Sequence, residues 1–370
     1  MMLFSSCAIN PRKKNDSIEF WRVLFTYLVI LLHFETSFKP EHRYLVCCYL
    51  AVEFFFVLSG FFLMRHCAND SEKCATRASA QYIALRFRQL YPAFLFACML
   101  ALCKIMFMDK AHIRVLGTTK EHIWDMSLLW MLVPNNATFV FHSWYISAMI
   151  VASYFIYWLL KTRRDFFIGF VAPLSIVLVY SYFARFKIGI DVHYGTRTPF
   201  VTDGILRAFA GLSVGCVAFC AQQKVNRVRR TLAAKAVLTF CELVVFCFLY
   251  QILIDNRHGN VDFVAIPLFA ALIVLEFSRL TFFSDVLNRK IFGFLGKASL
   301  GAYLNQGFCF AILFKNNIQR LPFPKAACIT LAVCTAAGFV SHYAVQAAFA
   351  LVARCKALRG RLTPKDVRAV

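Results

Sequence analysis

The sequence predicts an all-α fold: a polytopic membrane helix bundle with about ten transmembrane helices and with the N-terminus and the C-terminus inside. Three observations predict it. Hydrophobic residues make up 60% of the 370 residues, above the roughly 45–50% of a soluble domain. They occur in runs of about 17–25 residues, the length of a helix that crosses a bilayer. The runs lack the period-2 alternation of a membrane β-barrel, the other structure that satisfies its backbone in lipid.

The ten candidate helices are apolar runs bounded by charged residues, Pro or Gly, with ends placed to about 2–4 residues. They cover 18–38, 45–64, 82–107, 143–160, 166–184, 204–221, 234–254, 262–280, 291–314 and 325–352. Segment 123–140 is short and apolar only in patches, so we expect a re-entrant or interfacial piece there. The chain therefore divides into a cytoplasmic segment over 1–17, a membrane domain over 18–352 and a basic cytoplasmic tail over 353–370.

The distribution of the net charge of +22 predicts the orientation. Lys and Arg lie between the apolar runs rather than on one basic arm or face, which argues against nucleic-acid binding. They concentrate in every second connection, as the positive-inside rule requires. With the N-terminus inside, the basic inside segments are 12–14, 65–77, 161–164, 224–235, 279–297 and the tail from 354 to 368. An even number of crossings keeps this alternation, so both ends lie inside.

The fifteen cysteines lie mainly in apolar segments, and no paired CxxC motif is present. Cys216 and Cys220 have a lone i, i+4 spacing. We interpret most of the cysteines as small apolar fillers, and we predict no metal site.

The first candidate helix carries two ionisable residues, Arg22 and His33. It lacks a small-residue cleavage site, so it is a retained helix rather than a signal peptide. Eleven positions separate the two residues, which leaves them about 20° apart in azimuth and roughly 16 Å apart along the axis. Arg22, near the cytoplasm, can hold a phosphate, and His33, near the outer surface, can exchange a proton. The alternative is that Arg22 snorkels to the inner headgroups and that His33 faces the outer interface.

Two carboxylates lie near the outer ends of the first two helices. Glu53 is expected at about the depth of His33, where a carboxylate can orient an imidazole and raise its basicity. A structural role would still require a partner for Glu53, because an unpaired charge in lipid is expensive. Glu35, at the mouth of the first helix, is the weaker candidate, and we expect it to be a solvated interfacial residue.

Arg86 and Arg88 open the third helix on the cytoplasmic side, before Tyr91-Pro92. Together with Arg22 they can collect a polyphosphate. The alternative is a simple basic anchor at the inner headgroups.

His142, Trp144 and Tyr145 open the fourth helix on the outer side. Trp and Tyr are ordinary residues of the interfacial aromatic belt, and they can equally stack on a sugar. His193 and Arg197, in another outer loop, are further candidate contacts to an acceptor.

Five motifs, in this order, resemble those of the acyltransferase-3 family of membrane acyltransferases. They are Glu19-Phe20-Trp21-Arg22 with His33; Ala51 to Phe61; Arg86 to Tyr91-Pro92; Trp144-Tyr145-Ile146-Ser147; and Leu295 to Leu304. Three positions depart from the family pattern. Glu19 replaces the usual Asp, and Gln89 replaces the second Arg of the Arg-rich motif. Gln306 replaces a common His, from which we expect that this position is not needed for chemistry.

The resemblance implies transfer of an acyl group, usually acetyl, from cytoplasmic acetyl-CoA to a hydroxyl of a lipid-linked or surface glycan. His33 would be the general base assisted by Glu53, and an acyl-histidine intermediate is the alternative. Arg22, Arg86 and Arg88 would hold the coenzyme's phosphates. His142, Trp144, Tyr145 and Glu35 would contact the acceptor. The family's glycan role implies a multi-pass protein of the bacterial inner membrane.

Two other functions compete with this one. A transporter or flippase for a lipid-linked saccharide would use Arg22, His33 and Glu53 as a proton relay or substrate path. The sequence has no inverted repeat of the kind that many transporters carry. A non-catalytic scaffold would leave the shared face of Arg22 and His33 without a reason. The acceptor sugar, the acyl chain and the oligomeric state are left open by the sequence.

Overall fold

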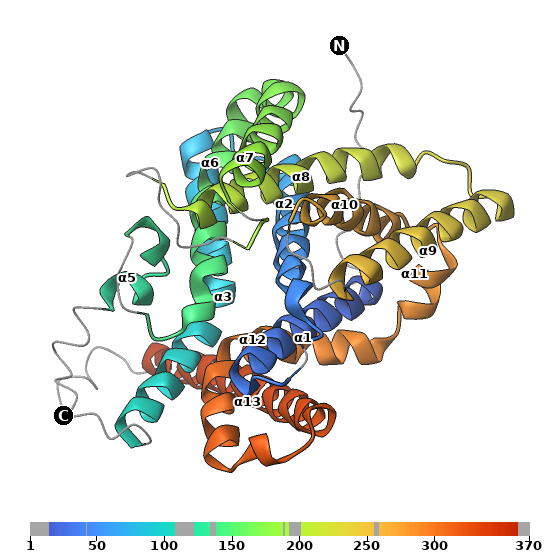
Figure 1. Ribbon diagram of the computed structural model, residues 1–370. Helices are drawn as coiled ribbons and strands as arrows, with labels where there is room; N and C mark the ends of the chain where they lie inside the picture. The colour runs from blue at the N-terminus through green and yellow to red at the C-terminus, as the bar shows by residue number, and fades with distance from the viewer. Residues whose placement is uncertain are drawn as a thin grey trace.

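A computed structural model describes residues 15–41, 43–107, 122–133, 138–187, 189–191, 201–254 and 259–361. These residues form helices and connecting turns without a β-strand (Figure 1). The all-α prediction is therefore confirmed. Each of the ten predicted apolar runs lies largely in helical segments, although run 166–184 spans the end of α6, η4 and α7, and run 45–64 spans η1 and α2.

The helical elements follow one another along the described residues. Their bounds are α1 (Asp16–Phe38), η1 (Val46–Leu50), α2 (Ala51–Asn69), α3 (Ala75–Phe107), α5 (Ile123–Met126), η2 (Trp130–Leu132), η3 (Phe141–Ser143), α6 (Trp144–Phe166), η4 (Phe167–Val171), α7 (Ala172–Phe186), α8 (Asp203–Val225), α9 (Leu232–Ile254), α10 (Asp262–Ser278), α11 (Phe282–Leu287), α12 (Lys290–Lys315), η5 (Ile318–Arg320) and α13 (Phe323–Arg361).

Seven helical segments of the described chain are long and apolar enough to span a membrane. One of them, Phe141–Phe186, contains two of the predicted crossings. Arg163 has non-helical backbone angles (φ −146°, ψ 58°), so the continuous run is interrupted between those two crossings. The predicted crossings over 262–280 and 291–314 form α10 and α12, which are not among the seven. The chain is thus a polytopic helix bundle, while the number of ten and the inside position of both termini stay predictions.

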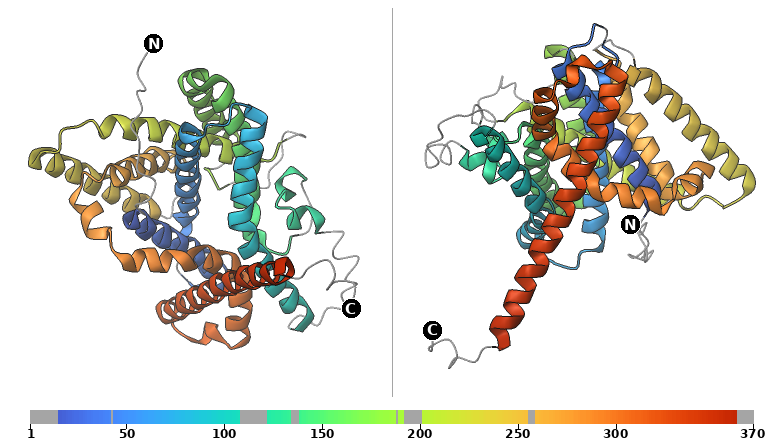
Figure 2. Two further views of the ribbon diagram at one scale, coloured as in Figure 1. Left: turned by 180° about the vertical axis from the view of Figure 1, so that it is seen from behind. Right: turned by 90° about the horizontal axis from the view of Figure 1, so that it is seen from below.

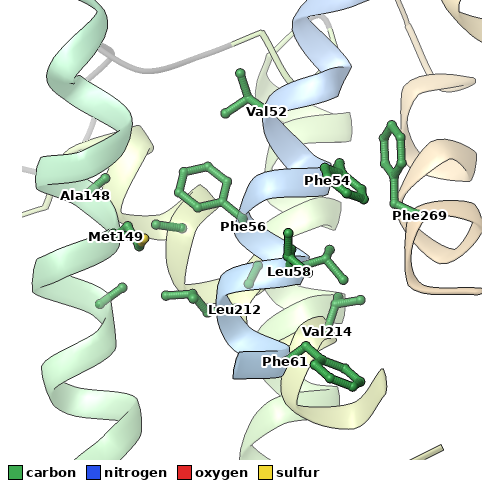
Figure 3. Close-up of a cluster of buried hydrophobic side chains, with 14 of the residues drawn as sticks. Val52, Phe54, Phe56, Leu58, Phe61, Ala148, Met149, Leu212, Val214 and Phe269 are labelled. Carbon is green, nitrogen blue, oxygen red and sulfur yellow. The ribbon is translucent and has the colours of Figure 1, made fainter. Parts of the chain in front are cut away.

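The core of the bundle is the crossing of α2 and α8. A Cβ atom at Gly60 would collide with the backbone carbonyl of Leu212, and one at Gly215 would collide with that of Val57. Glycine at both positions therefore lets the two backbones approach closely, as small residues do in membrane helix pairs. Figure 3 shows the aromatic and aliphatic packing around this crossing, with Phe54 facing Phe269 of α10 and Phe56 directed toward α6.

Segment 123–140 packs against the start of α6 instead of crossing the bundle. Asp125 accepts hydrogen bonds from the Phe139 backbone N–H (2.6 Å) and the Ser143 hydroxyl (3.2 Å). The indole of Trp130 donates to the same hydroxyl (2.9 Å). Burial raises the pKa of Asp125, and the hydrogen bonds that it accepts from Phe139 and Ser143 oppose that rise. The described part of the segment matches the predicted non-crossing piece.

α13 is the longest helix of the protein. Its 39 residues give a length of roughly 58 Å, about twice the ~30 Å hydrocarbon layer. Figure 2 shows the C-terminal part of α13 extending well beyond the other helices. The helix continues past the predicted crossing, which ended at 352, as far as Arg361.

Candidate functional site

Five helices, α1, α2, α3, α6 and α12, enclose a cavity of about 340 Å³, which we call the central cavity. This volume is at the lower end of the ~300–1,000 Å³ range of small-molecule sites. Its walls are mostly apolar, with two guanidinium groups, from Arg22 and Arg86, and the hydroxyl-bearing side chains of Thr26, Ser59, Tyr145, Ser299 and Tyr303. An apolar pocket with a few convergent polar groups is the expected form of a binding site.

One face of α1 lines the central cavity. Arg22, Thr26 and Val29 contribute to the wall, at intervals of four and three residues. His33 continues the same series four residues later, so it lies on the same face of the helix. Arg22, which lines the cavity, and His33, which lies beyond it, are therefore on the same face of α1.

Arg22 and Arg86 give one part of the cavity a net positive charge. Arg22 pairs with Glu19 at 2.9 Å. Gly296 of α12 lies against this carboxylate so closely that a Cβ atom there would collide with it. Arg86 donates to the side-chain carbonyl of Gln89 (3.3 Å) and forms no ion pair within the described ranges. Arg88 is exposed and does not line the cavity, whereas Gln89 does.

His33 is hydrogen-bonded to Gln306 of α12. The distance from Nδ1 of His33 to Oε1 of Gln306 is 3.0 Å, and Nε2 of Gln306 donates to the Tyr303 carbonyl (2.8 Å). Because the amide nitrogen is used as a donor, the amide oxygen faces His33, and Nδ1 must carry the hydrogen. This tautomer, assigned from the hydrogen-bond network, leaves Nε2 with its lone pair.

His142 and Tyr303 complete the surroundings of His33. The His142 and His33 ring centroids are 4.4 Å apart. The Tyr303 hydroxyl, on the cavity wall, donates to the His142 carbonyl (2.7 Å). Three elements that are distant in sequence, α1, η3 and α12, are therefore tied together at this point.

Glu53 lies in a different environment from the one expected. Its carboxylate forms a buried ion pair with Arg207 of α8 and accepts a hydrogen bond from the Tyr180 hydroxyl (3.2 Å). No hydrogen bond between Glu53 and His33 occurs in the described structure. Arg207 was missed by the sequence reasoning. An arginine inside an apolar run is the signal that singled out Arg22, and it could have identified Arg207 as the partner that Glu53 requires.

Glu35 is fully buried, so the expectation of a solvated residue is wrong. Its two oxygens accept hydrogen bonds from the backbone N–H groups of Tyr44 (2.7 Å) and Leu45 (3.2 Å). Arg43 lies 3.6 Å away as an ion-pair partner. The carboxylate closes the turn between α1 and η1, because these backbone donors would otherwise be unsatisfied at the edge of the bundle.

The two aromatic candidates at the start of α6 lie in different environments. Tyr145 lines the central cavity, and its hydroxyl lies 3.2 Å from that of Ser59. Trp144 is buried, and its ring lies 5.4 Å from the guanidinium carbon of Arg207. His193 and Arg197 fall outside the described residues.

Comparison with known proteins adds one match. The acyltransferase-3 family model, described as an acyltransferase domain, matches residues 15–342, a range that contains all five motifs and the central cavity. The comparisons with curated proteins and with solved structures each found no match. No group of three or more His, Cys, Asp or Glu side chains in the described ranges could hold a metal ion.

Proposed function

The chain belongs to the acyltransferase-3 family of membrane acyltransferases, and we propose that it moves an acetyl group from cytoplasmic acetyl-CoA to a hydroxyl of an extracytoplasmic or lipid-linked glycan. One observation carries the proposal. The face of α1 that lines the central cavity with Arg22 continues to His33. A donor with phosphates at one end and a thioester at the other fits this order of groups. The family's usual glycan role places the protein in the bacterial inner membrane in our proposal.

The donor's phosphates would be held by Arg22 and Arg86, because guanidinium groups form short charge-assisted hydrogen bonds to phosphate oxygens. Glu19 neutralises part of the Arg22 charge and fixes its side chain. The apolar wall of α2 and α6 would enclose the pantetheine arm. Arg88, which is exposed and does not line the cavity, would contribute mainly to the general positive charge of this face.

His33 would act as the general base on the acceptor hydroxyl. Nε2 accepts the hydroxyl proton while the hydroxyl oxygen attacks the thioester carbonyl. The new C–O bond forms, the C–S bond breaks, and the thiolate takes the proton from Nε2, so that the imidazole returns to its starting state. Gln306 would act as a positioning residue that keeps Nδ1–H in place. His142 and Tyr145 would contact the acceptor.

The transporter alternative requires a chain of proton carriers. Glu53 is bound to Arg207 rather than to His33, so the relay of Arg22, His33 and Glu53 lacks a link in the described structure. We therefore favour the enzyme.

The test is acetyl transfer in membranes that carry the wild type or His33→Ala, with labelled acetyl-CoA supplied to the cytoplasmic face. Loss of a general base is expected to lower transfer at least ~100-fold, with normal insertion verified by protease accessibility of the tail. Equal transfer by both proteins would exclude His33 as the base. Absence of transfer by the wild type across a panel of glycans would favour the transporter.

A further inference from the structure

A second cavity, which we call the side cavity, lies next to the central one. It has a volume of about 190 Å³ and is bounded by α3, α12 and α13. Gln89 and Leu300 line both cavities, so they form a shared wall. The proposed reaction has not used the side cavity.

The side cavity contains polar groups that are suited to an anion. Lys297 lines it, and its ammonium lies 5.8 Å from the ring centroid of Phe294, with no ion pair in the described structure. Ser341 also lines it, and its buried hydroxyl has no hydrogen-bond partner in the part of α13 and its surroundings that is described. Burying a hydroxyl without a partner costs free energy, so a ligand that accepts from Ser341 would remove that cost. His342 adds an imidazole, 3.0 Å from the Gln346 amide nitrogen.

Two contacts connect these groups to the cations of the central cavity. Gly296, the neighbour of Lys297, lies against the Glu19 carboxylate that pairs with Arg22. Gln89, in the shared wall, accepts a hydrogen bond from Arg86 (3.3 Å). Lys297 therefore extends the set of cations past the shared wall and into the side cavity.

The chemistry of the donor matches this arrangement. Coenzyme A carries its thioester at the end of an extended, uncharged arm, and its phosphates are on an adenosine nucleotide at the other end. A donor whose thioester reaches His33 has its nucleotide at the side of Arg22 and Arg86, where the side cavity begins. An ammonium group with rotatable donors suits a phosphate as a point charge, and Phe349 provides an aromatic ring for a base.

We propose that the side cavity extends the phosphate site of Arg22 and Arg86 and binds a phosphate of the nucleotide end of the acyl-CoA donor, with Lys297 as a further cation and Ser341 as a hydrogen-bond donor. The inference rests on the proposed acyltransferase function. It adds a subsite whose loss weakens binding of the complete coenzyme but leaves a donor without a nucleotide unaffected.

The first experiment compares the kinetics of wild type and variants with two acetyl donors, and a binding assay complements it. For Lys297→Gln we expect the KM for acetyl-CoA to rise about 10-fold, the magnitude of one charge-assisted hydrogen bond, with kcat unchanged. With S-acetylpantetheine, which has no phosphate, wild type and variant should be equal. Ser341→Ala should give a smaller rise with acetyl-CoA alone. Lys290→Gln, at the start of the same helix and outside both cavities, is the matched control.

Binding separates this inference from the proposed function. Radiolabelled coenzyme A is titrated into purified wild type and Lys297→Gln, with adenosine 3′,5′-bisphosphate as competitor. Lys297-dependent binding without acetyl transfer to any glycan of the panel would support the subsite and count against the enzyme function. Equal coenzyme binding by both proteins would overturn the subsite and leave the function untouched. If Lys297→Gln changes only the affinity for vesicles containing anionic lipid, the phosphate is that of a lipid headgroup, and the assignment to the coenzyme is wrong.

Discussion

Two parts of the bundle contain buried charges, and they use them differently. At the crossing of α2 and α8, Glu53 and Arg207 are paired with each other, and Tyr180 and Trp144 cover them. In the central cavity, Arg86 has no carboxylate partner within the described ranges, and Arg22 shares its guanidinium between Glu19 and open space. The first arrangement is neutral and closed, and the second is cationic and open. A charge inside a membrane bundle is thus a candidate for ligand binding when its surroundings leave it incompletely paired.

The closed pair gives the largest expected effect. Glu53→Ala leaves the Arg207 guanidinium buried without compensation, which is expected to cost ~3–5 kcal/mol of stability and to lower the unfolding temperature. Thermal unfolding of the detergent-solubilised protein measures the loss. The double variant Glu53→Gln with Arg207→Met removes both charges and should regain most of the stability.

The double variant also tests whether Glu53 serves only the ion pair with Arg207. If Glu53 belongs only to the closed pair, the double variant transfers acetyl groups at nearly the wild-type rate once it is folded. A folded double variant that is as inactive as His33→Ala would show that Glu53 assists the base, as the sequence suggested.

The second-largest effect is expected on substitution of Gln306. Gln306→Leu removes the acceptor for Nδ1–H of His33, so the imidazole loses its fixed tautomer, and we expect kcat to fall about 10–100-fold at unchanged KM, as for other orienting partners. Gln306→Glu keeps an acceptor at this position and should retain more activity than Gln306→Leu. The measurement is kcat as a function of pH for the three proteins. Equal kcat profiles for wild type and Gln306→Leu would rule out positioning by this residue.

Substitution of two arginines on α3 tests whether the central cavity binds the donor. Arg86 lines the central cavity and Arg88 does not. Arg86→Ala should raise the KM for acetyl-CoA about 10-fold, because a charge-assisted contact to phosphate is lost, whereas Arg88→Ala should change it less than ~3-fold. Steady-state kinetics with varied acetyl-CoA gives both values, and the reverse order would mean that the wrong face of α3 has been assigned to the donor.

The smallest effect concerns Asp70, which follows α2. It accepts a hydrogen bond from the Tyr157 hydroxyl (2.7 Å) and pairs with Lys161 at 3.2 Å. Burial alone would raise the pKa of Asp70, but hydrogen bonds from the Glu72 backbone, Tyr157 and Lys161 hold it below its ordinary value. A lowered pKa in the folded state contributes stability that is present above the unfolded-state pKa of about 3.9 and is lost as the pH falls through the folded value.

For Asp70→Asn we therefore expect a loss of about 1 kcal/mol at neutral pH, with a difference from the wild type that shrinks below about pH 4. Thermal unfolding from pH 3 to 7 measures it. A difference that stays constant over this range would mean that the charge of Asp70 does not stabilise the fold.

The apolar runs were sufficient to predict the helices, since crossing length and charge punctuation are local properties of the sequence. The shared face of Arg22 and His33 was equally predictable, because it depends only on helical periodicity. The side chains that pair across the bundle could not be predicted in this way. Arg207, an arginine inside an apolar run, could have been recognised as a candidate partner, but the spacing of residues does not show that it meets Glu53 or that Glu35 meets the backbone of a turn. Gln306 was taken as dispensable because of its residue type, while the structure places its amide on His33.

The bond between Tyr303 and the His142 carbonyl has a consequence for the membrane itself. If the donor comes from the cytoplasm and the acceptor from the opposite side, as we propose, the reacting groups have to meet without opening a pore through the membrane. Tyr303 of α12, His142 of η3 and the tilted pair of His33 and His142 rings lie at this end of the central cavity and would form the partition. In that reaction, sealing of the membrane and catalysis would rely on the same few side chains. A substitution that widens this region to admit a larger acceptor also thins the barrier against proton leak.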